Sequence, residues 1–301
     1  MTAPIEELTA GDDVWLSGYA YLLRAQFLEN VSRIGQMRSD VEAALDCFRR
    51  AGDRWSQACA LSLRAQLRLC DDLDGALADL RESRSLAANF GSPTLGDRMD
   101  VDLRWIELHL RSGDTDRAIA TTEAARDRAV RVASSWTLAV LDVREAGIRV
   151  RRGELSRAAE LLDAVPPGPS GETATPDDLV RALAGCARAG LCLRLGDGAG
   201  AATALTGAFA AARRSGDLPL LSAVTVHAAE LAAARGRPEE SAVLLGAAAG
   251  LRGTDDDTDP LIRELAGQVR AELGREDFAK AYAEGRVLDR DTASRLGDPG
   301  A

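Results

Sequence analysis

Residues 103–118 read LRWIELHLRSGDTDRA, a helical pattern that stops at a Gly-Asp pair and then starts again. Leu103, Ile106 and Leu110 recur at steps of three and four, which places them on one face of a helix. Gly113 suits the left-handed conformation that often ends a helix, and the aspartate after it suits the positive N-terminal end of the next helix. The segment therefore predicts two helices joined by a tight turn.

The same turn recurs along the chain at a nearly constant interval. Gly113, Gly153, Gly196 and Gly236 lie successively 40, 43 and 40 residues apart, which indicates a repeat protein. A small residue follows each glycine by five positions, where a neighbouring helix must approach closely and a larger side chain would cost ~1–3 kcal/mol. These small residues are Ala118, Ala158, Ala201 and Ser241.

Two earlier copies of the repeat lack the glycine. Ala76 indicates a copy whose turn lies at Asp71, and Ala43 indicates a first copy at a shorter spacing. Behind the acidic break at Thr254–Asp259 we expect short helices near 260–273, 275–284 and 289–296. The six copies predict helix pairs at 12–31 and 38–51, 54–70 and 72–90, 94–112 and 115–133, 135–152 and 155–164, 177–195 and 198–214, and 218–235 and 238–252.

We therefore expect an all-α fold, a tetratricopeptide-like right-handed solenoid of helical hairpins with about six repeats of about 40 residues and a C-terminal helical cap. Residues 1–252 are expected to form the solenoid and residues 253–301 the cap, in one domain with a continuous core. The stiff loop at residues 166–171 is either a domain linker or a loop between repeats. The second interpretation is favoured because the repeat resumes beyond it.

The net charge of −10 argues against nucleic-acid binding by this chain alone, because phosphate contacts supply most of that affinity. The strongest basic cluster, Arg144, Arg149, Arg151 and Arg152, is interrupted by glutamates. The only lysine, Lys280, follows an alanine, so the Gly-Lys-Ser/Thr of a Walker-type phosphate loop is absent. No signal peptide or membrane-spanning stretch is recognised, and we expect a cytoplasmic protein that does not contact a membrane.

Motifs for cofactors, metals and catalysis are weak or missing. Gly196-x-Gly198-x-x-Ala201 matches a dinucleotide fingerprint, but it lies in phase with the repeat turns and has no βαβ context. The acidic break begins with the spacing of a calcium loop, but Pro260 stands where that loop needs glycine. The five cysteines form no Cys-x-x-Cys pair, and the two histidines lie in different repeats. We therefore expect no enzyme activity, no catalytic residue, no cofactor and no metal.

Aromatic and polar residues on the predicted first helices are the candidate binding residues, because first helices line the concave face of stacked pairs. The four tryptophans all lie on such helices. They form either an aromatic groove or part of the core between repeats, and the core is favoured. The candidates for a ligand or partner groove are Trp15, Tyr19, Trp55, Arg64, Arg68, Arg104, Trp105, Glu107, Trp136, His227 and Glu230.

The C-terminal quarter has the most distinctive sequence. Residues 241–252 read SAVLLGAAAGLR, and residues 273–286 read LGREDFAKAYAEGR. This tail resembles the end of large actinobacterial transcriptional regulators of the antibiotic regulatory protein and LuxR-like types, where a tetratricopeptide-like region ends in an "LLGAA…LR" helix and an "LG…F…A…GR" cap. The resemblance is specific over this tail and loose over the repeats before it.

In that family the repeat region is regulatory and lies C-terminal to a DNA-binding module and often to an ATPase module. The resemblance implies a non-catalytic sensory domain that binds a small-molecule signal or a partner segment in the concave groove. Binding would control DNA-binding and ATPase modules of the same or an associated regulator. We expect an excised domain or a stand-alone relative, since the sequence shows no such module. The alternative is a scaffold for peptide docking or oligomerisation that senses no ligand.

Overall fold

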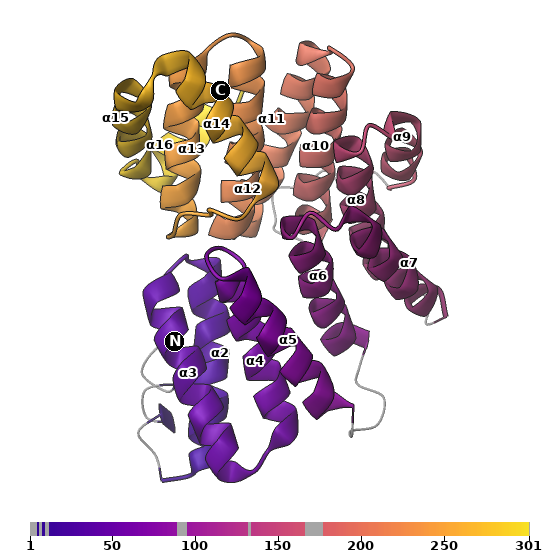
Figure 1. Cartoon of the computed structure of the whole chain (residues 1–301), viewed down its shortest axis with the longest axis vertical. Helices are drawn as coiled ribbons and strands as arrows, with labels where there is room; N and C mark the ends of the chain where they lie inside the picture. The colour runs from indigo at the N-terminus through magenta and orange to yellow at the C-terminus, as the bar shows by residue number, and fades with distance from the viewer. Residues whose placement is uncertain are drawn as a thin grey trace. The chain divides into compact units, whose positions relative to one another are not determined.

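The computed structural model describes residues 12–88, 95–131, 134–165 and 177–300, together with Ile5, Leu8 and Thr9. The described residues form helices α2 to α16 and contain no strand, which confirms the predicted all-α class (Figure 1). The predicted loop at residues 166–171 lies outside them. The chain divides into two compact units, unit 1 (Met1–Thr121) and unit 2 (Thr122–Ala301).

Unit 1 contains three helical hairpins, the last of which continues past its boundary. Within it α2 packs on α3, α3 on α4, α4 on α5, and α6 contacts both α4 and α5 (Figure 1). Phe48, Leu45 and Leu61 lie at the centre of its first core cluster with no exposed surface. The helices are α2 (Val14–Asn30), α3 (Ile34–Ala51), α4 (Arg54–Arg68), α5 (Leu73–Ala87), α6 (Leu95–Arg111) and α7 (Thr115–Arg131).

Unit 2 contains three further hairpins and three short C-terminal helices. One core cluster combines residues of α10 to α13 with Val269, Phe278 and Ala293 from the last three helices. The last three helices are therefore packed on the final hairpins of the repeat. The helices of unit 2 after α7 are α8 (Ser135–Arg151), α9 (Leu155–Asp163), α10 (Asp177–Arg194), α11 (Gly198–Ser215), α12 (Leu218–Ala234), α13 (Pro238–Arg252), α14 (Pro260–Leu273), α15 (Arg275–Arg286) and α16 (Arg290–Gly297).

The four glycine turns have the conformation that the sequence predicts. Gly113, Gly153, Gly196 and Gly236 have φ values of 78°, 75°, 77° and 69°, in the left-handed region. In each turn the backbone N–H of the next residue donates to a carbonyl five residues earlier, as from Asp114 to the carbonyl of His109 at 2.8 Å. This bond satisfies a carbonyl at the end of the first helix, so each hairpin is specified locally.

In the second to sixth repeats the small residue occupies the fourth position of the second helix. Ala76, Ala118, Ala158, Ala201 and Ser241 are all fully buried there. In the first repeat the prediction was wrong, because α3 begins at Ile34 and its fourth residue is Met37, whereas Ala43 is only half-buried. The turn before α3 has no glycine, and Ser32 adopts a φ of 55° instead.

The glycines of the distinctive C-terminal tail lie where two helices touch. Gly246 on α13 and Gly285 on α15 both pack against backbone atoms of the other helix, and a Cβ on Gly246 would overlap the Tyr282 carbonyl. The tail motif thus encodes a close helix contact that only glycine permits. Among the described residues, no helix is long and apolar enough to cross a membrane.

Candidate functional site

A chain of hydrogen bonds crosses the three first helices of unit 1. The side-chain amide of Gln66 on α4 donates to Glu29 on α2, and Arg104 Nε on α6 donates to Gln66 Oε1 at 2.9 Å. Arg104 Nη1 also donates to Ser62 Oγ at 3.1 Å. We call Glu29, Ser62, Gln66 and Arg104 the first-helix ladder. Because each member is held by another, the ladder presents donors and acceptors in fixed positions.

The pKa of Arg104 in the ladder is perturbed by burial. Burial lowers the pKa of its guanidinium, while the charges of Asp100 and Glu29 act in the opposite direction. An arginine stays protonated even after such a shift. The ladder therefore places a partly desolvated positive charge beside the Glu29 carboxylate.

An aromatic pair lies on α2. The rings of Trp15 and Tyr19 stack with centroids 5.6 Å apart and planes 3° apart, and both residues are 43% exposed. Trp15 Nε1 donates to Asp53 Oδ2 at 2.7 Å, and Asp53 caps the start of α4. Burial would raise the pKa of Asp53, but hydrogen bonds from Ser56, Trp15 and two backbone N–H groups lower it below its usual value. The stack is thus fixed to the next hairpin.

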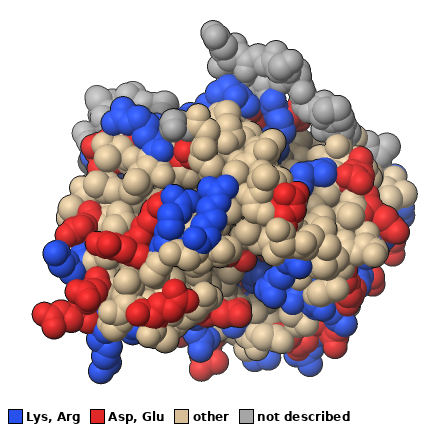
Figure 2. All heavy atoms as spheres, turned by 90° about the horizontal axis from the view of Figure 1, so that it is seen from above, with Lys and Arg blue, Asp and Glu red and all other residues tan. Residues whose placement is uncertain are grey.

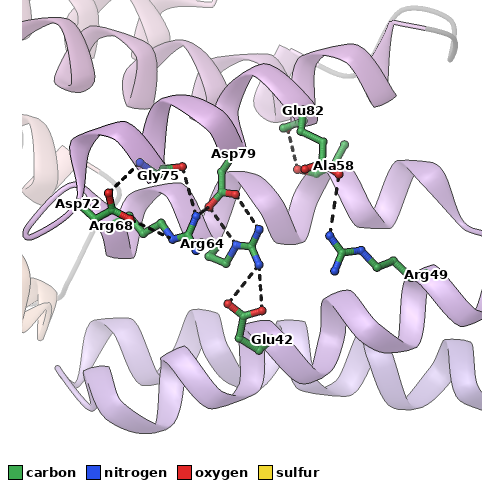
Figure 3. A network of polar contacts seen from close by, with 10 residues as sticks. Glu42, Arg49, Ala58, Arg64, Arg68, Asp72, Gly75, Asp79 and Glu82 are labelled. Carbon is green, nitrogen blue, oxygen red and sulfur yellow. Dashed lines mark hydrogen bonds and ion pairs between the residues drawn. The ribbon is translucent and has the colours of Figure 1, made fainter.

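Arg64 and Arg68 lie apart from the ladder and contact the second helices. Arg64 binds both oxygens of Asp79 on α5, at 3.0 and 2.7 Å, and Glu42 on α3 at 2.9 Å (Figure 3). Arg68 reaches the same Asp79 at 3.0 Å. The Asp79 side chain is only 3% exposed, so two cations compensate one buried carboxylate. Their positions indicate a role in joining α3, α4 and α5.

Glu107 and Trp105 on α6 also have structural partners. Glu107 pairs with Arg111 at 2.6 Å, and the buried Arg111 donates to the Leu69 carbonyl at 3.1 Å. Trp105 is 9% exposed and belongs to a core cluster of α4, α5 and α6. The guanidinium of Arg84 on α5 lies 4.8 Å from the Trp105 ring centroid. Trp105 thus faces α5, and Trp55 on α4 is half-buried.

In unit 2 the predicted candidates His227 and Glu230 come together on α12. Their Nδ1 and Oε2 atoms are 3.1 Å apart, and the side chains are 21% and 19% exposed. Burial would raise the pKa of Glu230, but the hydrogen bond from His227 and the charges of Arg194 and Arg151 lower it. Arg194 is the last residue of α10 and Arg151 is the last residue of α8. The three first helices of unit 2, α8, α10 and α12, therefore all contribute charged groups around Glu230.

A thiol near this pair is unreactive, and the remaining candidate of unit 2, Trp136, is exposed. Cys186 on α10 is buried, and burial, with a contribution from Glu230, raises the pKa of its thiol to about 12, so the thiolate that would react is scarce at neutral pH. Trp136 on α8 is 40% exposed.

Two arginines of the basic cluster in the sequence, Arg149 and Arg152, pair with glutamates. Arg149 pairs with Glu145 at 3.1 Å and with Glu154, and Arg152 pairs with Glu154 at 2.7 Å. Basic and acidic side chains also lie close to one another in several places on the face shown in Figure 2. Within the described ranges, no group of three or more His, Cys, Asp or Glu residues could hold a metal ion.

Three of the four ladder residues, Glu29, Ser62 and Gln66, are not among the candidates predicted from the sequence. Ser62 and Gln66 lie four positions apart on a predicted first helix, which places them on one face, but polar uncharged residues are common on exposed helix surfaces. Glu29 lies near the end of α2 among other charged and polar residues. To identify these residues one must know which positions of α2, α4 and α6 lie opposite one another, and a single sequence does not contain that information.

Comparison with known proteins informs on the fold. No protein-family model matches the chain, and no curated protein does. Among solved structures, the chain is similar to the apo form of the quorum sensor NprR from B. thuringiensis. The two share 15% sequence identity and a TM-score of 0.52, over 98% of this chain and 91% of the other. The match supports a tetratricopeptide-like helical-repeat fold.

Proposed function

We propose that this chain is a non-catalytic regulatory domain of a transcriptional regulator, and that it receives its signal on the first helices. The signal is a small molecule or a segment of a partner protein. Binding would control DNA-binding and ATPase modules of the same or an associated regulator. The actinobacterial regulators that the C-terminal tail resembles, and the quorum sensor with a similar fold, both support a regulatory role.

The first-helix ladder is the observation that carries this proposal. Glu29, Gln66 and Arg104 come from three successive first helices, so one ligand seated there contacts three hairpins of unit 1 together. A ligand that binds one arrangement of the hairpins better than another shifts the population toward it. Stacked repeats contact only their neighbours, which makes such rearrangement possible.

The experiment is a thermal-shift screen of the whole chain against a metabolite panel and a pool of random heptapeptides. A ligand that binds only the folded chain raises the melting temperature in a saturable way. Each hit is then measured on Arg104→Met, which keeps the side-chain stem, and on the control Arg50→Met, whose charge is exposed. The proposal expects weaker binding to the first variant alone. The proposal is contradicted if no hit binds more weakly to Arg104→Met than to the wild type.

The exposed aromatic stack on α2 favours a second function, a scaffold that docks a partner without sensing. Two stacked rings that are each 43% exposed form an anchor typical of interfaces. Light scattering after size exclusion would reveal self-association of the chain. If Trp15→Ala with Tyr19→Ala abolishes association while no screened molecule shifts the melting temperature, the scaffold is the better account.

A further inference from the structure

A cavity of about 570 Å³ opens inside unit 1 among α5, α6 and the first turns of α7. Its lining includes residues of two second helices, such as Leu77 on α5 and Thr121 on α7, as well as residues of α6. None of the four ladder residues lines it. The cavity is therefore a separate site from the first-helix ladder, and its volume is in the range of small-molecule sites.

Aromatic and apolar side chains form one part of the wall. Trp105 and His109 both line the cavity, with ring centroids 5.6 Å apart and planes inclined by 35°. Val101 and Leu108 lie on the same helix and also line it. A flat aromatic molecule would find ring contacts and apolar surface here.

The indole N–H of Trp105 lacks a hydrogen-bond acceptor. Trp105 is nine-tenths buried, and its Nε1 has no partner among the described residues. A buried donor without a partner is unfavourable, and such groups call for a specific explanation. An acceptor atom on a bound ligand would give this N–H its hydrogen-bond partner.

Basic side chains form another part of the wall. Arg81 and Arg84 on α5 have no carboxylate partner within the described part of the chain, and the Arg84 guanidinium lies over the Trp105 ring. Arg117 pairs with Asp114 at 3.3 Å, and Asp102 is the second carboxylate of the wall. Three arginines against two aspartates leave a positive excess, in a chain of net charge −10.

His109 adds an adaptable polar group. Burial lowers the pKa of its imidazole, and Arg117 lowers it further, while Asp114 opposes this. A neutral imidazole at pH 7 carries one donor and one acceptor nitrogen. Hence the positive charge of the wall comes from the arginines alone.

We propose that this cavity binds a low-molecular-weight aromatic carboxylate. The ring system lies against Trp105 and His109, and the carboxylate accepts hydrogen bonds from the guanidinium groups of Arg81 and Arg84. Guanidinium forks match carboxylates in geometry and stack on aromatic faces, so one pair of arginines serves both parts of such a ligand. Neutral aromatics of the same size lose the charged contacts.

Isothermal titration calorimetry of the whole chain with 2-naphthoate tests this proposal, with 2-naphthamide as the uncharged match. We expect the acid to bind at least about tenfold more tightly than the amide, as loss of one charged hydrogen bond implies. The double variant Arg81→Gln with Arg84→Gln should weaken naphthoate binding by at least about tenfold. The control Arg50→Gln removes an exposed arginine outside the cavity and should leave it unchanged.

Trp105→Phe tests the aromatic wall separately. It keeps a ring in the core but removes the indole N–H, so we expect weaker naphthoate binding with unchanged helical circular dichroism. If that variant fails to fold, the double arginine variant still tests the proposal. Arg81 and Arg84 are exposed, so their substitution should leave the fold intact. Equal binding of acid and amide, equal loss in Arg50→Gln, or no binding of naphthoate to the wild type would overturn the proposal.

Discussion

Arg104 on α6 donates from Nε to Oε1 of Gln66 on α4 at 2.9 Å, and Gln66 in turn donates to Glu29 on α2. These residues lie 38 and 37 positions apart, close to one repeat length. The repeat therefore places one side chain per hairpin in register. A side-chain link of this kind joins neighbouring hairpins directly, in addition to their apolar packing.

Arg104→Met should destabilise unit 1. The substitution removes a charged donor to Gln66 and Ser62 while keeping most of the apolar stem. We expect a loss of about 1–2 kcal/mol in the free energy of unfolding, measured by urea unfolding followed by circular dichroism. The matched variant Arg50→Met, at an exposed pair with Asp46, should change it by less than about 0.5 kcal/mol. Equal stabilities of the two variants would refute a structural role for the ladder.

Asp79→Asn should be more damaging than an ordinary surface substitution. It leaves the charges of Arg64 and Arg68 without their buried partner, although Glu42 still faces Arg64 (Figure 3). We expect a loss of about 2–3 kcal/mol in urea unfolding. Asp46→Asn, at a 69% exposed carboxylate, is the control and should be nearly neutral. The interpretation fails if the two variants unfold at the same urea concentration.

Gly246→Ala should destabilise unit 2, because its Cβ would overlap the Tyr282 carbonyl across the α13–α15 contact. Overpacking of this kind costs at least about 1–3 kcal/mol. Gly267→Ala on α14 is the matched control, because a Cβ there meets no atom within 4 Å. Alanine favours a helix over glycine by up to about 1 kcal/mol, so the control should raise the melting temperature. If both variants shift the melting temperature in the same direction, the close contact between α13 and α15 is contradicted.

Glu230→Gln should change how stability depends on pH. The folded pKa of Glu230 is lowered by His227, Arg194 and Arg151 despite burial, so its ionised form stabilises the fold. This contribution is complete above the unfolded pKa of about 4.3 and is lost as the pH falls through the folded value. Between pH 7 and pH 3 the wild type should therefore lose more stability than the variant. Glu239→Gln, at an exposed glutamate, should keep the wild-type profile. Parallel profiles for all three proteins would contradict the assignment.

The hairpins could be predicted from the sequence because their signals are local. A positive φ at Gly113 and the hydrogen bond from Asp114 to His109 depend on a few consecutive residues, and apolar spacing fixes the helices on either side. The first repeat shows the limit of this method. Ser32 replaces the glycine, so nothing in the sequence marked the start of α3, and Ala43 was assigned in place of Met37.

The proposed binding surface could be predicted only in part, because it depends on which way each side chain points. Arg104 was a candidate, and the structure places it in the ladder with Gln66. Arg64 lies on α4 like Gln66, but its side chain contacts Asp79 on α5. Successive residues of a helix point about 100° apart, so an error of one position in the predicted helix phase assigns a side chain to the wrong face. The cavity beside Trp105 depends on three helices from two hairpins, and no spacing within one helix reveals it.

We propose above all that the first-helix ladder receives the signal. The most direct measurement is the dissociation constant of any molecule found by thermal shift, determined by calorimetry for the wild type, Arg104→Met and Arg50→Met. We predict at least about tenfold weaker binding to Arg104→Met and an unchanged constant for Arg50→Met. The account is contradicted if every molecule found in this way has the same dissociation constant for all three proteins.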